Sequence, residues 1–187
     1  MRNLNNNKNL HQVSERELAR LAGISRTTLR HIKEGERNAS LKTLKKIAQA
    51  SHRELELFEY LKNSKADFRY SVPVVSLAVS QEGEDSWKLH FFNLIDEFLR
   101  TKDARLLITP PVRALNPRLQ ALISAIVLEL CHRSEFSPPA WALDAAPLSQ
   151  PWFVSGIESL KASAILESPA RFKMKNVFIL ENFFERA

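Results

Sequence analysis

The chain has 187 residues, a formal net charge of +6, 44% hydrophobic residues and 9% aromatic residues. This composition excludes a disordered chain, and the length allows one medium domain or two small ones. No apolar run approaches the roughly 20 residues that a membrane span needs, and the polar start lacks the apolar stretch of a secretory signal. A single cysteine, Cys131, excludes a disulfide framework, so we expect a cytoplasmic protein without membrane contact.

The positive charge lies in the first third of the chain. Residues 1–66 contain 14 Lys and Arg against 7 Asp and Glu, whereas residues 67–187 contain 13 against 14. A basic head on a near-neutral body is typical of a nucleic-acid-binding domain joined to a domain with another role. We therefore expect a DNA-binding domain over 1–62, a linker over 63–85 and a second domain over 86–187.

Short helices are predicted along the first domain. Ser14 and Glu17 form an S-x-x-E capping box, and apolar residues at helical spacing follow it. Glycines end the first two of these helices, and serines are suited to begin each of them. The predicted helix starts are Ser14, Ser25, Ser40 and Ser51, the predicted stops are Gly23 and Gly35, and the last helix runs through Leu55, Phe58 and Leu61.

The rest of the chain is also predicted to be mainly helical. The linker contains Pro73 and an alternating apolar stretch over 75–79, so it can include one short strand. Apolar residues from Trp87 to Leu99 recur with the period of an amphipathic helix. Asn116-Pro117 is a helix start, and the apolar run from Leu119 to Cys131 behind it is predicted to be the central helix. Two further helices are expected near 154–167 and 177–185.

Residues 17–35 meet the physical requirements of two helices packed at a steep angle. Ala19 is the small residue between the helices, Gly23 opens the turn, and Ile24 fills the space beside it. On the second helix Leu29 and Ile32 face inward. Polar and basic residues are left on the outer face: Arg26, Thr27, Arg30 and His31.

The segment RELARLAGISRTTLRHIKEGERNASLKTLKKIAQA resembles the Cro and repressor (XRE) type of helix-turn-helix family. The resemblance covers about Val13 to Ala50, and both the turn and the downstream helix fit the family pattern in register. It implies that a recognition helix beginning at Ser25 enters the major groove of DNA. We predict an all-α protein with an N-terminal lambda-repressor-like domain and a C-terminal helical domain.

The resemblance assigns base reading to Arg26, Thr27 and His31. Arginine can bind guanine O6 and N7, threonine offers a hydroxyl and a methyl group, and histidine can donate to a base or a phosphate. Supporting contacts to DNA, mainly to its phosphates, are expected from the polar and basic residues around the motif. These are Ser25, Thr28, Arg30, Arg16, Arg37, Asn38 and Lys42.

The sequence departs from the family pattern at several positions. Glu15 stands where the family often has a phosphate-binding glutamine, Lys33 where it often has a glutamate, and Ala39 where it often has a proline. The family's first helix would lie before Ser14, where the sequence has few apolar residues and a poor period. An acidic residue at position 15 would repel phosphate, and Arg16 is a substitute.

We expect no enzyme activity, no metal and no cofactor. The five histidines are scattered without metal-ligand spacing to carboxylates or cysteine, and four glycines leave little scope for a phosphate-binding loop. Cys131 is expected to be buried beside an exposed His132. The aromatic residues Trp87, Trp141, Trp152 and Phe153 are expected in the core. An enzyme would need a cleft that gathers Glu129, Asp144, His132 and Arg133.

The leading functional hypothesis is a sequence-specific repressor that binds double-stranded DNA as a homodimer. Pairing of two half-sites strengthens a modest single-domain affinity, and the second domain would dimerise the protein or sense a signal. The alternative is an antitoxin that autoregulates its operon and binds a co-encoded protein partner through residues 86–187. A helix-turn-helix used only for protein contact is a third interpretation, against which the basic outer face argues.

Overall fold

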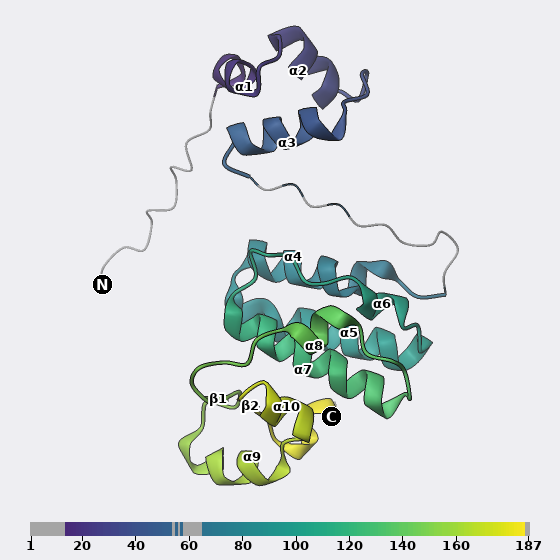
Figure 1. Ribbon diagram of the computed structural model, residues 1–187, viewed down its shortest axis with the longest axis vertical. Coiled ribbons are helices and arrows are strands. Elements are labelled where there is room, and N and C mark those ends of the chain that lie inside the picture. The colour runs from purple at the N-terminus through teal and green to yellow at the C-terminus, as the bar shows by residue number, and fades with distance from the viewer. Residues whose placement is uncertain (1–13, 54, 56, 58–64, 186–187) are drawn as a thin grey trace. The chain divides into compact units, whose positions relative to one another are not determined.

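The computed structural model describes residues 14–53, 55, 57 and 65–185. The chain divides into an N-terminal unit, residues 1–57, and a C-terminal unit, residues 58–187 (Figure 1). Regular structure in the described ranges is helical apart from one two-stranded sheet, which confirms the predicted all-α class. No helix in these ranges is both long enough and apolar enough to cross a bilayer.

Three helices form the described part of the N-terminal unit: α1 (Glu15–Ala22), α2 (Arg26–Lys33) and α3 (Leu41–Ala50). Each begins behind a predicted serine, whose Oγ accepts a hydrogen bond from the backbone amide three residues later, at 3.2, 2.9 and 3.1 Å. The capping box is only half formed, because the Glu17 carboxylate accepts hydrogen bonds from Arg20 instead of from the Ser14 amide. These local polar contacts fix the three helix starts.

The core of the N-terminal unit is small. Leu18, Ala19 and Leu29 are buried, and Ile24 and Ile47 pack against them. Gly23 ends α1 with a left-handed φ of 67°, which glycine adopts without the usual cost to a side chain. The amide of Ile24 then donates to the Ala19 carbonyl at 3.0 Å, which completes the turn between α1 and α2.

Two predicted helices of this unit fall wholly or partly outside the described residues. One precedes Ser14, and the other was expected to run from Ser51 through Leu61. The predicted start of this second helix is wrong, because Ser51 ends α3. The Ser51 amide and hydroxyl both donate to the carbonyls of Ile47 and Ala48. Arg53, Leu55 and Leu57 are not helical.

The C-terminal unit is built around α7 (Pro117–Arg133), in which every residue from 121 to 131 is buried. Its start is the predicted one, since the Asn116 side chain accepts from the Arg118 amide at 2.8 Å and Pro117 occupies the first turn. Helices α5 (Trp87–Thr101) and α8 (Ala140–Asp144) pack against it, and α4 (Val72–Glu82) packs against α5 and α6 (Arg105–Ile108) in the same core. The two predicted helices over 87–99 and 119–131 are therefore present.

The segment expected to be a linker with a short strand belongs instead to this core. A 3₁₀ turn, η1 (Phe68–Tyr70), leads into α4, and another, η2 (Glu84–Ser86), leads into α5. In α4, Val72, Val75 and Val79 are buried at helical spacing. The stretch 75–79 alternates in hydrophobicity, but Pro73 lies in the first turn of α4, where its missing amide hydrogen has no intrahelical partner to lose.

The last third of the chain differs from its prediction. Strands β1 (Trp152–Phe153) and β2 (Val177–Phe178) pair in parallel, with Trp152 opposite Val177. The helix expected over 154–167 is shortened to η3 (Glu158–Leu160) and α9 (Lys161–Glu167). The prediction of a helix over 177–185 is wrong, since β2 occupies 177–178 and is followed by the 3₁₀ turn η4 (Glu181–Phe184). A buried hydroxyl fixes this path: Ser168 Oγ accepts from the Ile179 amide at 2.7 Å.

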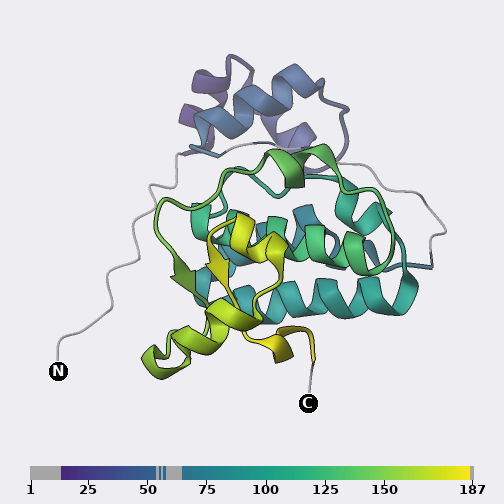
Figure 2. The same ribbon diagram turned by 60° about the horizontal axis from the view of Figure 1, so that its bottom comes forward.

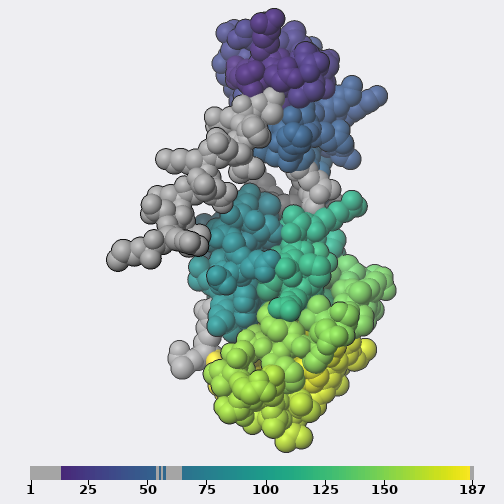
Figure 3. Space-filling model, turned by 90° about the vertical axis from the view of Figure 1, so that its left-hand side faces the viewer, coloured from purple at the N-terminus to yellow at the C-terminus, as the bar shows by residue number. Residues whose placement is uncertain are grey.

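Residues 170–174 form the short helix α10 (Ala170–Met174). Figure 2 shows α10, in yellow, lying against α7. The Arg171 guanidinium lies 3.7 Å from the buried carboxylate of Glu129, and Lys175 is itself buried, with its ammonium donating to the carbonyls of Leu143 and Ala145. In the space-filling view, the light green and yellow residues of β1, α9 and α10 gather at one end of the C-terminal unit (Figure 3).

Candidate nucleic-acid interface

Helix α2 has one buried side and one exposed side. Leu29 is only 1% exposed and anchors the inner side, with Ile32 half-buried one turn later. Arg26 and Thr27 lie on the first turn of α2 and are exposed, as is Arg30 on the next turn. Among the described residues, no hydrogen bond or ion pair holds the side chain of Arg26 or Thr27. These two side chains are therefore available to an external ligand.

The start of α2 is reinforced by hydroxyl groups. Ser25 Oγ accepts from the Thr28 amide at 2.9 Å and donates to Thr28 Oγ1 at 2.8 Å. Thr28 Oγ1 also accepts a hydrogen bond from Arg37 Nη1 at 3.3 Å. The structure thus brings together three predicted supporting residues, Ser25, Thr28 and Arg37, in one cluster.

The loop after α2 folds back onto the helix. Gly35 has a left-handed φ of 75° and reverses the chain. The next two amides, those of Glu36 and Arg37, both donate to the His31 carbonyl, at 2.9 and 3.2 Å. This backbone turn carries the Glu36 side chain to the His31 ring, while Asn38 beyond it is exposed.

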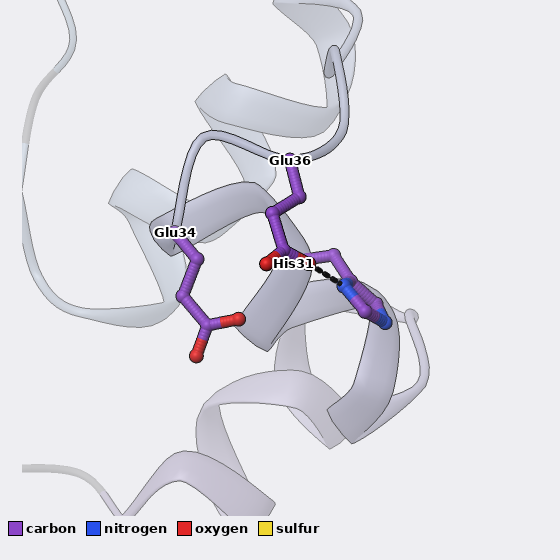
Figure 4. Close-up of side chains that lie close together, drawn as sticks. All are labelled: His31, Glu34 and Glu36. Carbon is purple, nitrogen blue, oxygen red and sulfur yellow. Dashed lines mark hydrogen bonds and ion pairs between the residues drawn. The ribbon is translucent and has the colours of Figure 1, made fainter.

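His31, the third predicted base reader, is half-buried and paired. Its Nδ1 lies 2.5 Å from Glu36 Oε2 (Figure 4). With Glu34 these residues bring three possible ligand atoms within 4.8 Å of one another, so the expectation that no histidine lies near carboxylates in a ligand-like group is wrong here. Glu34 is also 3.9 Å from Arg30, and such exposed acidic groups are common in ion pairs without a metal.

The two charged departures from the family pattern form an ion pair with each other. Lys33 Nζ donates to Glu15 Oε1 at 2.8 Å, which joins the end of α2 to the start of α1. Lys33 lowers the pKa of the Glu15 carboxyl below its ordinary value, and the nearby Arg26 and Arg30 lower it further. The negative charge at position 15 is therefore compensated locally. Sequence reasoning missed this pair and the role of Glu36, although the opposite charges that positions 15 and 33 gain relative to the family pattern were a signal for the pair.

The remaining predicted contacts lie on two other helices. Arg16 is exposed in the first turn of α1, and Lys42 is exposed in the first turn of α3. No hydrogen bond or ion pair within the described residues holds either side chain. Both are thus free to approach a phosphate.

Residues 1–57 match the family model for the helix-turn-helix. This N-terminal segment is a helix-turn-helix. The matched segment is the one that resembles the XRE type, and α1 and α2 are the helices on either side of its turn at Gly23. A comparison with curated proteins and another with solved structures found no match.

Two surface hollows lie among the described residues of the C-terminal unit. One, of about 390 Å³, has aromatic walls from Trp87, Phe92 and Phe183. The other, of about 430 Å³, is lined by residues that include Trp141 and Cys131. The Trp141 indole donates a hydrogen bond to the Leu107 carbonyl at 3.0 Å. Burial raises the pKa of the Cys131 thiol, and His132 beside it is exposed, as expected.

The four residues that an enzyme would need to gather are not gathered in either hollow. Glu129 is buried and binds Arg133 at 2.8 Å, and its second oxygen faces Arg171. His132 is exposed on the end of α7, and Asp144 is exposed at the end of α8 beside Lys175. None of the four lines either hollow.

Proposed function

We propose that this protein is a sequence-specific transcriptional repressor that acts as a dimer in the cytoplasm, with α2 as its recognition helix. The observation that carries the proposal is the exposure of Arg26 and Thr27 at the start of α2, where no hydrogen bond within the described residues holds either side chain. Leu29 holds the opposite side of that turn in the core, so the two polar side chains are presented on a fixed support.

Base reading is assigned to Arg26, Thr27 and His31. Arg26 at the first position of α2 has the planar donor pair that matches guanine O6 and N7, a contact worth about 1–3 kcal/mol of discrimination. Thr27 is suited to a thymine methyl group through its own methyl. His31 lies one turn further along the helix, with Glu36 on one ring nitrogen.

Phosphate contacts are assigned to the basic and polar residues around α2. Arg37 and Asn38 follow the recognition helix, while Arg16 and Lys42 stand at helix starts, where backbone amides also favour an anion. Arg30 is exposed on α2 itself. Ser25 and Thr28 support the site by fixing the first turn of α2.

A dimer is proposed because helix-turn-helix proteins of this type read two half-sites one helical turn apart. The C-terminal unit is the proposed source of the dimer contact or of a sensing function. Sedimentation of the purified chain with and without DNA tests this: a monomer under both conditions contradicts the dimer.

A gel-shift experiment with the DNA upstream of the protein's own reading frame tests the proposed reading residues. The double variant Arg26→Ala with His31→Ala is expected to abolish the specific shift, while binding to unrelated DNA persists through phosphate contacts. The control, Arg20→Ala with His132→Ala, changes the same residue types at exposed positions outside the proposed interface and should bind as the wild type does. An unchanged shift for the first variant would contradict the assignment of base reading to Arg26 and His31.

Exposed apolar side chains favour a second candidate, an antitoxin that binds a co-encoded protein. Leu166 on α9 and Met174 on α10 are 81% and 68% exposed. The two helices are adjacent there, since Lys173 Nζ donates to the Leu166 carbonyl. This candidate is supported if the protein co-purifies with the product of a neighbouring reading frame and if Leu166→Lys and Met174→Lys weaken that association. It is contradicted if no such product co-purifies with the protein.

A further inference from the structure

We propose that Glu36 is a positioning residue that makes the His31 ring a hydrogen-bond acceptor toward DNA, so that His31 selects adenine or cytosine. The inference rests on the proposed function of α2 as a recognition helix. It concerns two residues, His31 and Glu36, whose contact is drawn in Figure 4.

The chemistry of the pair fixes the position of the proton. Glu36 Oε2 lies 2.5 Å from His31 Nδ1, and an ionised carboxylate can only accept a hydrogen bond. Nδ1 must therefore carry the hydrogen. When the ring is neutral only one nitrogen is protonated, so Nε2 then presents a lone pair, whereas in a doubly protonated ring both nitrogens donate. The selectivity that we propose therefore belongs to the neutral ring.

The backbone holds this arrangement in place. Gly35 turns the chain, and the Glu36 amide donates to the carbonyl of His31 itself at 2.9 Å. Backbone and side chain of Glu36 therefore both contact the same residue of α2. A contact anchored at both ends keeps one ring orientation better than a freely moving surface ion pair does.

An acceptor at Nε2 selects among the base edges of the major groove. Adenine N6 and cytosine N4 are amino donors, whereas the guanine O6 and N7 and thymine O4 atoms only accept. A phosphate oxygen is also an acceptor, so this tautomer disfavours phosphate contact by His31. The pair thus turns an ambiguous side chain into a reader of amino groups.

The tautomer is tested directly by nitrogen NMR of the full-length, uniformly labelled chain at pH 8.5. The wild-type His31 ring, assigned by its loss in His31→Ala, is expected to show the Nδ1–H tautomer. In Glu36→Ala the ring is expected to move toward the Nε2–H tautomer. An Nε2–H ring in the wild type, or no change in Glu36→Ala, overturns the inference without reference to DNA.

Base selection is tested by enrichment from a random duplex pool at pH 8.5 with EDTA present. The wild type should enrich one position as adenine or cytosine, and His31→Ala should lose that preference. Glu36→Ala should weaken it by roughly fivefold or more, the lower end of the range for one base contact, while the other positions persist. Glu34→Ala is the matched control, since it removes an equal charge from the same cluster without touching His31 Nδ1, and it should retain the preference.

The outcomes separate the inference from the proposed function. A His31-dependent preference for guanine or thymine, or a preference unaffected by Glu36→Ala, overturns the inference and leaves the recognition helix in place. A preference that appears only with added Zn²⁺ assigns the cluster to a metal and also overturns it. A wild type that enriches no sequence contradicts the proposed function and, with it, this inference. Melting curves of both glutamate variants verify that the unit remains folded.

Discussion

Glu15 and Lys33 illustrate what a residue-level interpretation of the sequence leaves out. Each departs from the family pattern, and a separation of 18 positions in the sequence gives no indication that the two side chains are in contact. Only the packing of α1 against α2 brings them to 2.8 Å. The outward position of Arg26 and Thr27, by contrast, follows from helix periodicity alone and could be predicted.

The Glu15–Lys33 pair leads to a prediction about DNA affinity. Glu15→Gln removes a negative charge from the basic face and releases Lys33, so affinity for duplexes of any sequence should rise severalfold at low salt. Fluorescence anisotropy with a duplex of arbitrary sequence measures this. Glu17→Gln, which removes a carboxylate bound to Arg20 on the same helix, is the control with a smaller expected effect. Unchanged or weaker binding by Glu15→Gln would contradict the placement of this pair on the face that approaches DNA.

At the scale of elements, signals contained within a few residues were predicted correctly. The serine starts of α1, α2 and α3 and the Asn116-Pro117 start of α7 are examples, since each depends on a side chain and an amide two or three residues away. The strands β1 and β2 could not be predicted, because two-residue strands carry no measurable period and their pairing joins segments far apart in the chain. The sequence predicts a linker where α4 lies, because the apolar residues over 75–79 alternate like those of a strand while Val72, Val75 and Val79 also have helical spacing.

Burial on α5 gives a prediction for the stability of the C-terminal unit. Leu94 is fully buried, whereas Leu89 on the same helix is 58% exposed. Leu94→Ala should lower the free energy of unfolding by about 2–5 kcal/mol, because it leaves a cavity in the core. Leu89→Ala should change it by at most about 0.5 kcal/mol. Urea denaturation followed by tryptophan fluorescence measures both, and similar midpoints for the two variants would contradict the packing of α5.

A buried carboxylate links the segment before α4 to α5. Glu97 accepts hydrogen bonds from Arg100 and from the Asp67 amide, and the Arg100 guanidinium, followed by that amide, lowers the pKa of Glu97 below its ordinary value of 4.5. A carboxyl with a lowered pKa in the folded state stabilises the fold above the unfolded-state pKa, and this stability is lost as the pH falls through the folded value.

The C-terminal unit should therefore lose stability below about pH 4.5 through Glu97, in addition to what other carboxyls contribute. In Glu97→Gln the neutral amide cannot titrate, so the decline in unfolding free energy over this acidic range should be shallower than in the wild type. Urea titrations at a series of pH values measure the slope. Parallel slopes for the two proteins would show that Glu97 is not held as the structure has it.

At the scale of the whole molecule, the excess positive charge and the larger hydrophobic core lie in different units of the chain. The helix-turn-helix match covers residues 1–57, and the excess of positive charge lies in the same part of the chain. The C-terminal unit contains the larger core, two apolar hollows and exposed apolar side chains on α9 and α10. The excess of positive charge in the first third is visible in the sequence, whereas the inclusion of α4 in the second core required the structure.

The central claim is that α2 reads a DNA sequence. The most direct test is a titration of the full-length chain with the duplex enriched by selection and with a shuffled duplex of equal composition, at one salt concentration. We predict that the selected duplex binds at least about 10³-fold more tightly. Arg26→Ala should weaken binding to the selected duplex by the free energy of one base contact, about 1–3 kcal/mol. Its effect on binding to the shuffled duplex should be much smaller. Equal affinity for both duplexes, unchanged in Arg26→Ala, would contradict the account.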